Sequence, residues 1–457
     1  MQLSADRLPA RVPARGLSGN LRELLAAPYA FLADAAERHD GIASFRVFHR
    51  TFVVVSDARL IEQALVTDAA LFVKGRQYKN VQMLIGRGLV TLPDGPWQEH
   101  RRVIQPGFHR KALTHLAGVV TSAVERRLAE WREGGSGRPF PVVTGMRAIS
   151  EQVISEVLLG TPVEEMISAR VSALFEDAFR ALAVRNWSPV SLPAFVPTRG
   201  TRMIAAKRRA LYAFLETRME ARLAEGVGTH GDVLDMLLLA HIDPGDRQPA
   251  FSREDVIGEM STLYLAGYET TAATLSWALY FLARYPDVQS RLHEEVRRVL
   301  GKRPPSWDDI PALVYTGQVI SETLRLRPAI HTIARVATRT TSLGGYRIPA
   351  GTTVMFSFYG LHRSPRYWPA PATFDPDRFD PAVGRSWPKL AYMPFSIGQH
   401  RCIGANLAIA EATLALAEMA RRVELHLPPG MAELQPVNGL THFPKPFELL
   451  LTPRSPA

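Results

Sequence analysis

Residues 394–404 read Pro-Phe-Ser-Ile-Gly-Gln-His-Arg-Cys-Ile-Gly and contain the only cysteine of the 457-residue chain. Phe395, Gly398, Cys402 and Gly404 form the pattern F-x-x-G-x-x-x-C-x-G. A lone cysteine is most often an inert core residue. Here the glycines let the backbone fold tightly against a flat group, and an aromatic side chain can cover the sulfur. The pattern therefore favours a metal-binding thiolate at Cys402 over a structural cysteine.

The residues after Gly404 predict a helix over 406–421, which places Cys402 near a helix N-terminus. Free N–H groups and the helix dipole favour an anion there, so we expect the pKa of the thiol to be lowered. A single cysteine excludes an intrachain disulfide and the cysteine-rich zinc sites. The chemistry of the chain must therefore be sought around one thiol.

The bulk properties narrow the function further. The formal net charge of +10 is compatible with nucleic acid, an anionic membrane or an acidic protein partner. No long Lys/Arg block or zinc-finger spacing supports nucleic acid. The N-terminus lacks the apolar region of a signal peptide, and no apolar run reaches the length of a membrane helix. We expect a cytoplasmic protein without an integral membrane anchor.

Hydrophobic periodicity predicts one large, mainly helical domain with small β-sheets. Helical patterns dominate from about residue 57 to 325, and short β-rich runs occur at 42–48, 51–56, 332–339, 345–348 and 353–356. We assign 1–20 to an irregular arm and 21–457 to the domain. A long, largely apolar helix is predicted over 252–284, starting at a capping signal in Ser252 and Asp255. Such a helix can hold one face of a cofactor.

The cysteine segment resembles the haem-ligand signature of the cytochrome P450 family at each defining position. The resemblance implies the cytochrome P450 fold and haem b, with Cys402 as the axial iron ligand and His400 at a haem propionate. Glu322-Thr-Leu-Arg325 resembles the family's E-x-x-R motif, and residues 372–379 resemble the loop that supplies a further arginine, Arg378. Glu322, Arg325 and Arg378 would then form a buried triad that supports the cysteine loop.

Three more segments match the family in order along the chain. Residues 266–271 (Ala-Gly-Tyr-Glu-Thr-Thr) resemble its oxygen-binding motif. There Ala266 and Gly267 would face the haem, Gly267 would leave room for dioxygen, and Glu269 with Thr270 would deliver protons. Trp97-Gln-Glu-His-Arg101 resembles the family's W-x-x-x-R helix, and Trp97 and Arg101 are suited to bind haem propionates. Arg335 matches another propionate-binding arginine of the family. An acid inside an apolar helix supports the functional interpretation of Glu269, because burying it is costly.

The resemblance implies a monooxygenase that inserts one oxygen atom of O2 into a C–H or C=C bond of a lipophilic molecule. A fatty acid, terpenoid, steroid or polyketide all remain open. Phe72, Phe179, Trp187 and Phe443 are the bulky candidates for the substrate pocket. A peroxide-driven peroxygenase and a non-enzymatic haem-thiolate sensor are the alternatives. The former would not need Glu269 and Thr270, and no signalling or DNA-binding module supports the latter.

No dinucleotide fingerprint or Walker A motif is present, so electrons must come from another protein. We expect a ferredoxin or flavodoxin served by an NAD(P)H-dependent reductase, and a monomeric enzyme. A basic patch for an acidic donor would comprise Arg101, Arg102, Arg110, Lys111, His400, Arg401, Arg421 and Arg422.

Overall fold

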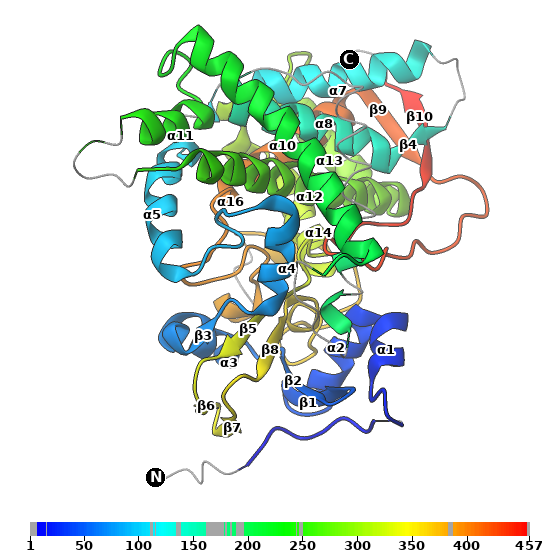
Figure 1. Ribbon diagram of the computed structural model, residues 1–457. Coiled ribbons are helices and arrows are strands. Elements are labelled where there is room, and N and C mark those ends of the chain that lie inside the picture. The colour runs from blue at the N-terminus through cyan, green and yellow to red at the C-terminus, as the bar shows by residue number, and fades with distance from the viewer. Residues whose placement is uncertain are drawn as a thin grey trace.

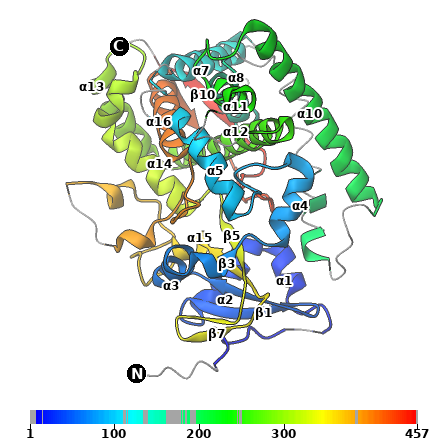
Figure 2. The same ribbon diagram turned by 60° about the vertical axis from the view of Figure 1, so that its left-hand side comes forward.

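The computed structural model places most of the chain. It describes residues 7–14, 16–109, 113–114, 116–133, 139–160, 178, 181–182, 185–188, 196–243, 245, 250–382 and 387–454. Figure 1 shows a helical region in its upper part and a smaller region of strands in its lower part, next to the N-terminus. Figure 2 shows the same division from another side. The prediction of a mainly helical fold with small sheets is confirmed.

The described helices lie at α1 (Leu21–Ala26), α2 (Pro28–Glu37), α3 (Ala58–Glu62), α4 (Arg76–Ile85), α5 (Asp94–Ile104), α7 (Leu116–Glu133), α8 (Val142–Leu159), α10 (Arg199–Glu225), α11 (Val233–Ile242), α12 (Arg253–Arg284), α13 (Pro286–Leu300), α14 (Val314–Leu326), α15 (Phe358–Leu361) and α16 (Ala405–Arg422). Short 3₁₀ or π turns occupy Gln63–Thr67, Ala69–Leu71, Gln105–Phe108, Trp307–Ala312, Pro376–Phe379 and Lys389–Ala391. The strands are β1 (Ile42–Val47), β2 (Arg50–Val55), β3 (Phe72–Val73), β4 (Phe140–Pro141), β5 (Thr332–Ala337), β6 (Thr341–Leu343), β7 (Tyr346–Ile348), β8 (Thr353–Ser357), β9 (Val423–His426) and β10 (Glu448–Pro453). No described helix is both long and apolar enough to cross a membrane.

The largest sheet joins the N-terminal strands to strands of residues 332–357, with strand order β1-β2-β8-β5-β3. The predicted hairpin forms β1 and β2, in which Phe45 opposite Phe52 stacks at 5.3 Å between ring centroids. Strand β2 then pairs in parallel with β8, some 300 residues later in the chain. The described part of the expected N-terminal arm runs along this sheet, because Ser44 donates its backbone N–H to Ala10 and accepts from Val12. The domain boundary at residue 20 stays a prediction.

Helix α12 is the axis of the helical region. Ser252 and Asp255 form the expected capping box at its start, and Pro286 follows its end. Most of its residues are buried, because α8, α10, α14 and α16 pack around it. The predicted bounds for this helix and for the one after Cys402 are each within one residue of those observed.

Two glycines allow the neighbours of α12 to approach its backbone. A Cβ on Gly258 would collide with the backbone of Arg87, and a Cβ on Gly267 would collide with the side chain of Ile154 on α8. This contact gives Gly267 a packing reason beside the expected one, and room for dioxygen stays a prediction. The side chain that Gly267 lacks would point at α8, and the glycine serves the packing of the two helices.

We predict that Gly267→Ala destabilises the protein by about 1–3 kcal/mol, because it overpacks the α8–α12 contact. In an Ile154→Ala background the same substitution should become neutral or stabilising, because alanine is the better helix former by about 1 kcal/mol. Midpoints of thermal unfolding for the four proteins of this cycle test the coupling. Additive effects of the two substitutions would contradict the assigned contact.

Candidate active site

The segment that carries Cys402 is a tight turn before α16. The backbone N–H of Cys402 donates to the carbonyl of Phe395 at 3.0 Å, and that of Arg401 donates to Gly398 at 3.1 Å. Gly398 has φ +73°, and a Cβ there would collide with the backbone of Leu65. This position therefore requires glycine for both its conformation and its contact.

Cys402 has accessible surface. Even so, the surrounding protein removes water from its thiol, and this desolvation is the main influence on the pKa of the thiol. Burial raises the pKa of Cys402, while the N–H of Gly404 and the charges of Arg101 and Arg401 act in the opposite direction. The expected lowering of the pKa by the helix N-terminus is therefore wrong in the net, because desolvation of the thiolate outweighs these interactions. A metal ion could reach this sulfur, and its positive charge would stabilise the thiolate form.

One face of α12 is accessible halfway along an otherwise buried helix. Ala266 is exposed and Gly267 and Thr270 are half-buried, whereas most of the helix is buried. Ala266 and Thr270 lie one turn apart, and the hydroxyl of Thr270 donates to the carbonyl of Ala266 at 2.7 Å. A hydroxyl thus lies on a small, accessible helix face of the kind that a flat cofactor could cover.

Glu269 is directed to other neighbours than Thr270. Its carboxylate lies 3.6 Å from the guanidinium of Arg147 on α8 and accepts a 3.1 Å hydrogen bond from Thr441. The guanidinium of Arg147 lies 4.5 Å above the ring of Phe443. Glu269 is therefore paired with a base of a neighbouring helix, and Glu269 and Thr270 belong to two adjoining hydrogen-bond systems.

A cluster of basic groups joins the strands to α5. Arg335 on β5 is buried and donates to the hydroxyl of Tyr78 at 2.7 Å. His400 lies 2.8 Å from the carboxylate of Asp94 and 4.3 Å from the ring of Trp97. Lys74 donates to the backbone carbonyls of residues 89 and 92.

Asp94 is the acid beside this cluster, and it balances the positive charge of Lys74 and Arg335 only in part. Burial, and after it the charge of Arg335, lowers the pKa of Lys74 to about 7. Burial and the charges of Lys74 and Arg335 lower the pKa of His400 to about 4, and its Nδ1 is buried without a hydrogen-bond partner among the described residues. Carboxylate groups placed here would be strongly favoured. The guanidinium carbon of Arg101 lies 5.7 Å from the ring centroid of Trp97, and Arg101 donates to the carbonyl of Arg401 at 3.1 Å.

Sequence reasoning missed Lys74, Tyr78 and Asp94. Lys74 carries a usable signal, since it follows the apolar pair Phe72-Val73 in a segment whose alternation predicts an inward-facing position. Tyr78 and Asp94 join the cluster only through contacts with residues distant in the chain. Among the candidate pocket residues, Phe72 is a core residue of β3 and Trp187 packs on Phe52 at 5.5 Å. Phe179 lies outside the described residues.

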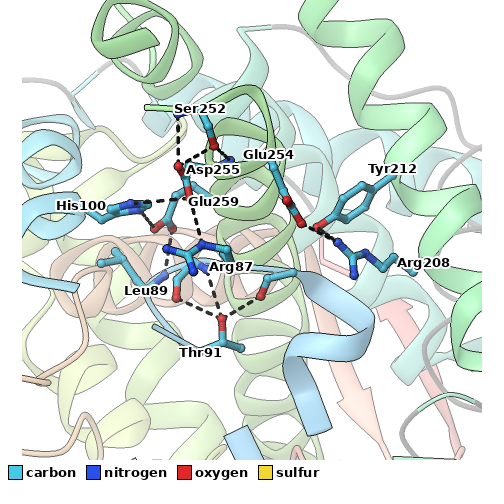
Figure 3. Close-up of polar contacts among 12 residues, drawn as sticks. Arg87, Leu89, Thr91, His100, Arg208, Tyr212, Ser252, Glu254, Asp255 and Glu259 are labelled. Atoms are coloured by element: carbon cyan, nitrogen blue, oxygen red, sulfur yellow. Dashed lines mark hydrogen bonds and ion pairs between the residues drawn. The ribbon is translucent and has the colours of Figure 1, made fainter. Parts of the chain in front are cut away.

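A buried polar network fixes α5 to α12, as Figure 3 shows. The carboxylate of Glu259, with no exposed surface, lies 2.7 Å from Nδ1 of His100 on α5 and accepts the backbone N–H of Leu89 at 3.0 Å. Burial raises the pKa of Glu259. This network sets the position of α5, and with it Trp97 and Arg101, relative to the accessible face of α12.

The pair Glu322–Arg325 is completely buried on α14, with two hydrogen bonds of 2.6 and 2.7 Å. Arg325 also donates to the carbonyls of His362, Pro371 and Thr373 at 2.8–2.9 Å. Arg378 lies 3.5 Å from Glu322, close enough for an ion pair. The structure therefore brings the three expected members together.

This triad reaches the cysteine segment through His362. The buried imidazole of His362 accepts the backbone N–H of Met393 at 2.9 Å, two residues before Phe395. Because its Nε2 is the acceptor, His362 is neutral, in agreement with a pKa that burial lowers to about 3. The connection from Arg325 to Met393 gives the triad the supporting role that the sequence predicted.

These observations fit a haem group. Cys402 offers an accessible sulfur, the face around Ala266 and Thr270 offers a flat approach, and the cluster around Arg335 requires anions. Lys74, Trp97, Arg335 and His400 would hold the propionates, and Arg101 would support the cysteine segment. The assignment of each residue remains an expectation from the geometry.

Comparisons with known proteins agree with this site. The family model described as Cytochrome P450 matches residues 7–451. Cyclooctatin synthase of Streptomyces melanosporofaciens is 32% identical over 441 residues, covering 96% of this chain and 94% of that protein. Pentalenene oxygenase of Streptomyces avermitilis is 29% identical over 453 residues, covering 99% and 98%.

Another relative and a solved structure extend the comparison. Cyclooctat-9-en-7-ol 5-monooxygenase of S. melanosporofaciens is 30% identical over 423 residues, covering 92% of this chain and 90% of that protein. The crystal structure of the cytochrome P450DA haem domain has a TM-score of 0.86 at 26% identity, covering 98% of this chain and 99% of that one. The similarity in sequence and fold spans essentially the whole chain.

We predict that Glu322→Gln reduces stability by about 3–5 kcal/mol, because it leaves Arg325 charged and buried without its counter-ion. Haem retention should fall with it, since the cysteine segment loses its support. A matched control is Glu130→Gln, which breaks an i,i+3 pair with Arg127 on the partly exposed face of α7. The control should cost less than about 1 kcal/mol. Equal losses of unfolding midpoint and haem content in both variants would refute the supporting role.

Proposed function

We propose, because the chain belongs to the cytochrome P450 family of haem-thiolate monooxygenases, that it inserts one oxygen atom into a C–H or C=C bond of a terpenoid. The observation that carries the proposal is that two groups are accessible: the sulfur of Cys402, just before α16, and the hydroxyl of Thr270 on α12. This arrangement provides a metal ligand and a proton-handling group on two elements that pack together.

The terpenoid class is supported by the names of relatives. Pentalenene and cyclooctat-9-en-7-ol are, by their chemical names, cyclic alkenes, and enzymes named for them align over nine-tenths or more of this chain. An apolar polycycle needs few hydrogen bonds from its pocket. Phe443, one of the candidate pocket residues, and Leu263 on α12 are apolar and buried, which is compatible with such a substrate.

The haem, when bound, supplies dioxygen binding and O–O cleavage, which a thiolate ligand favours by donating electron density. The chain's own residues control protons. Thr270 holds a proton at its Oγ atom on the accessible face of α12. Glu269 directly precedes Thr270 in the chain. It can take up a proton on the side that faces Arg147, whose side chain is 21% exposed. The carboxylate lies 3.6 Å from the guanidinium of Arg147 and accepts a hydrogen bond from Thr441 at 3.1 Å.

We further propose that a small acidic redox protein, a ferredoxin or a flavodoxin, delivers the electrons on the side of Cys402. The basic patch for it is smaller than the sequence suggested. Arg421 and Arg422 are paired with Glu418, and His400 is paired with Asp94. Arg110 and Lys111 lie outside the described residues. Arg401 is exposed and Arg101 half-buried, and the charges of both act on the thiol of Cys402.

The reduced, carbon monoxide-treated protein should show the strongly red-shifted Soret band of a thiolate-bound haem. In Cys402→Ser that band should disappear, since a hydroxyl does not replace the thiolate as an electron donor. Absorption difference spectra of both proteins, loaded with haem under the same conditions, test this. An unchanged band in the variant, or a wild-type protein that binds no haem, would remove the basis of the proposed function.

Thr270→Ala should uncouple turnover: reductant consumption continues while the product formed per reductant falls several-fold, because the proton at Oγ is lost. Thr270→Ser keeps the hydroxyl and is the matched control. The measurement is the ratio of product to reductant, with a terpenoid that perturbs the haem spectrum and a ferredoxin system. Full coupling in Thr270→Ala would exclude the hydroxyl from proton delivery.

A further inference from the structure

A second cavity lies at the C-terminal end of α12, apart from the haem site. Its volume is about 440 Å³, and its walls come from the ends of α12 and α14, from α15 and from the loops near residues 363, 372 and 433. Three arginines line it, Arg284, Arg327 and Arg363, together with one acid, Glu433. The other lining residues are aromatic or apolar. None of the residues assigned above to the haem or to proton delivery belongs to this wall.

Two of the three guanidinium groups are held in place by stacking. The guanidinium carbon of Arg363 lies 4.0 Å from the ring centroid of Tyr359, and that of Arg327 lies 4.4 Å from that of Trp277. Stacking uses the face of a guanidinium and leaves the N–H groups at its edge to be satisfied. These side chains are therefore fixed without having their donors consumed.

The described protein offers these arginines no counter-ion. No ion pair to Arg284, Arg327 or Arg363 occurs among the described residues, and Nε of Arg327 and Nη1 of Arg363 are buried without an acceptor there. Buried donors are normally satisfied in a folded protein, so such donors call for an explanation. Glu433 is exposed at the wall and makes no described ion pair with any of the three.

The positive charge of these arginines lowers the pKa values of neighbouring basic groups. Burial, and then the charges of Arg327 and Arg325, lowers the pKa of Arg363 to about 9, so this side chain remains charged at neutral pH. The pKa of the neighbouring His442 is lowered by burial and by His331, Arg327 and Arg363. The cavity is therefore a region of positive potential inside the protein.

We propose that this cavity binds a phosphate group, either as inorganic phosphate or as part of a small phosphorylated metabolite. Guanidinium groups present planar N–H donors that match phosphate oxygens. Three arginines and one glutamate leave a net charge of two, which matches a phosphate near its dianionic state. The aromatic walls would accommodate an organic substituent. The site is independent of the substrate and of the electron donor proposed above.

Isothermal titration of the haem-loaded protein with inorganic phosphate, at constant ionic strength kept with sodium chloride, tests the proposal. We expect saturable 1:1 binding. Arg327→Gln should weaken it by about tenfold and the exposed Arg284→Gln by about threefold. Glu433→Gln should tighten it by about threefold, because it removes the only acid of the wall. Arg298→Gln, an exposed position on α13 outside the cavity, is the charge-matched control and should bind like wild type.

The outcomes separate the proposal from general attraction by a basic surface. Titration with adenosine 5′-monophosphate distinguishes the two sources of the group: equal affinities favour inorganic phosphate, and tighter binding favours a phosphorylated metabolite. Absence of saturable binding, or equal weakening in Arg284→Gln and Arg298→Gln, would overturn the proposal. The carbon monoxide spectrum of each variant serves as the check of folding, and Arg284→Gln keeps the test decisive if Arg327→Gln does not fold.

Discussion

The fully buried ion pair between Glu322 and Arg325 is the interaction on which the active site depends. Such a pair is weak evidence for stability, because desolvation consumes most of its Coulomb energy. The role of the pair here is geometric. Arg325 donates hydrogen bonds to three backbone carbonyls of residues 362–373, and His362 in turn accepts the backbone N–H of Met393. A turn without regular secondary structure is thereby held in one conformation. The exposed Cys402 belongs to this hydrogen-bonded turn.

Desolvation sets the chemistry of this site more than helix dipoles do. The thiol of Cys402 has an N–H group and two guanidiniums to favour its ionised form, yet burial prevails and its pKa is raised. On the other side, Lys74 and His400 are driven toward their neutral forms by burial and by Arg335. A group that brings positive charge to the sulfur and negative charge to the strands relieves both costs. An iron porphyrin with two propionates is such a group.

Helix α12 serves packing and chemistry on different faces. Its glycines admit α8 and the loop at Arg87, its acid Glu259 fixes α5, and Ala266 with Thr270 remains accessible. Its far end contributes to the second cavity, where no ion pair to the three arginines occurs in the part of the chain that the structure describes. Burial along most of its length therefore does not make this helix uniform: Glu259 and Glu269 find partners in neighbouring elements, whereas Thr270 borders an accessible space.

The sequence by itself determined the mainly helical fold class and the ends of α12 and α16, which follow from hydrophobic period and capping. It also singled out Cys402 through the glycines around it, whereas the triad of Glu322, Arg325 and Arg378 was implied only by the resemblance of those segments to a known family. Tertiary structure alone decided that Gly267 serves packing, that Glu269 meets Arg147, and that the net influence on the thiol is desolvation. It also revealed Lys74 as part of the site. Each of these depends on what lies opposite a residue in space, and the strength of a charge depends on the water removed around it, neither of which is encoded in local spacing.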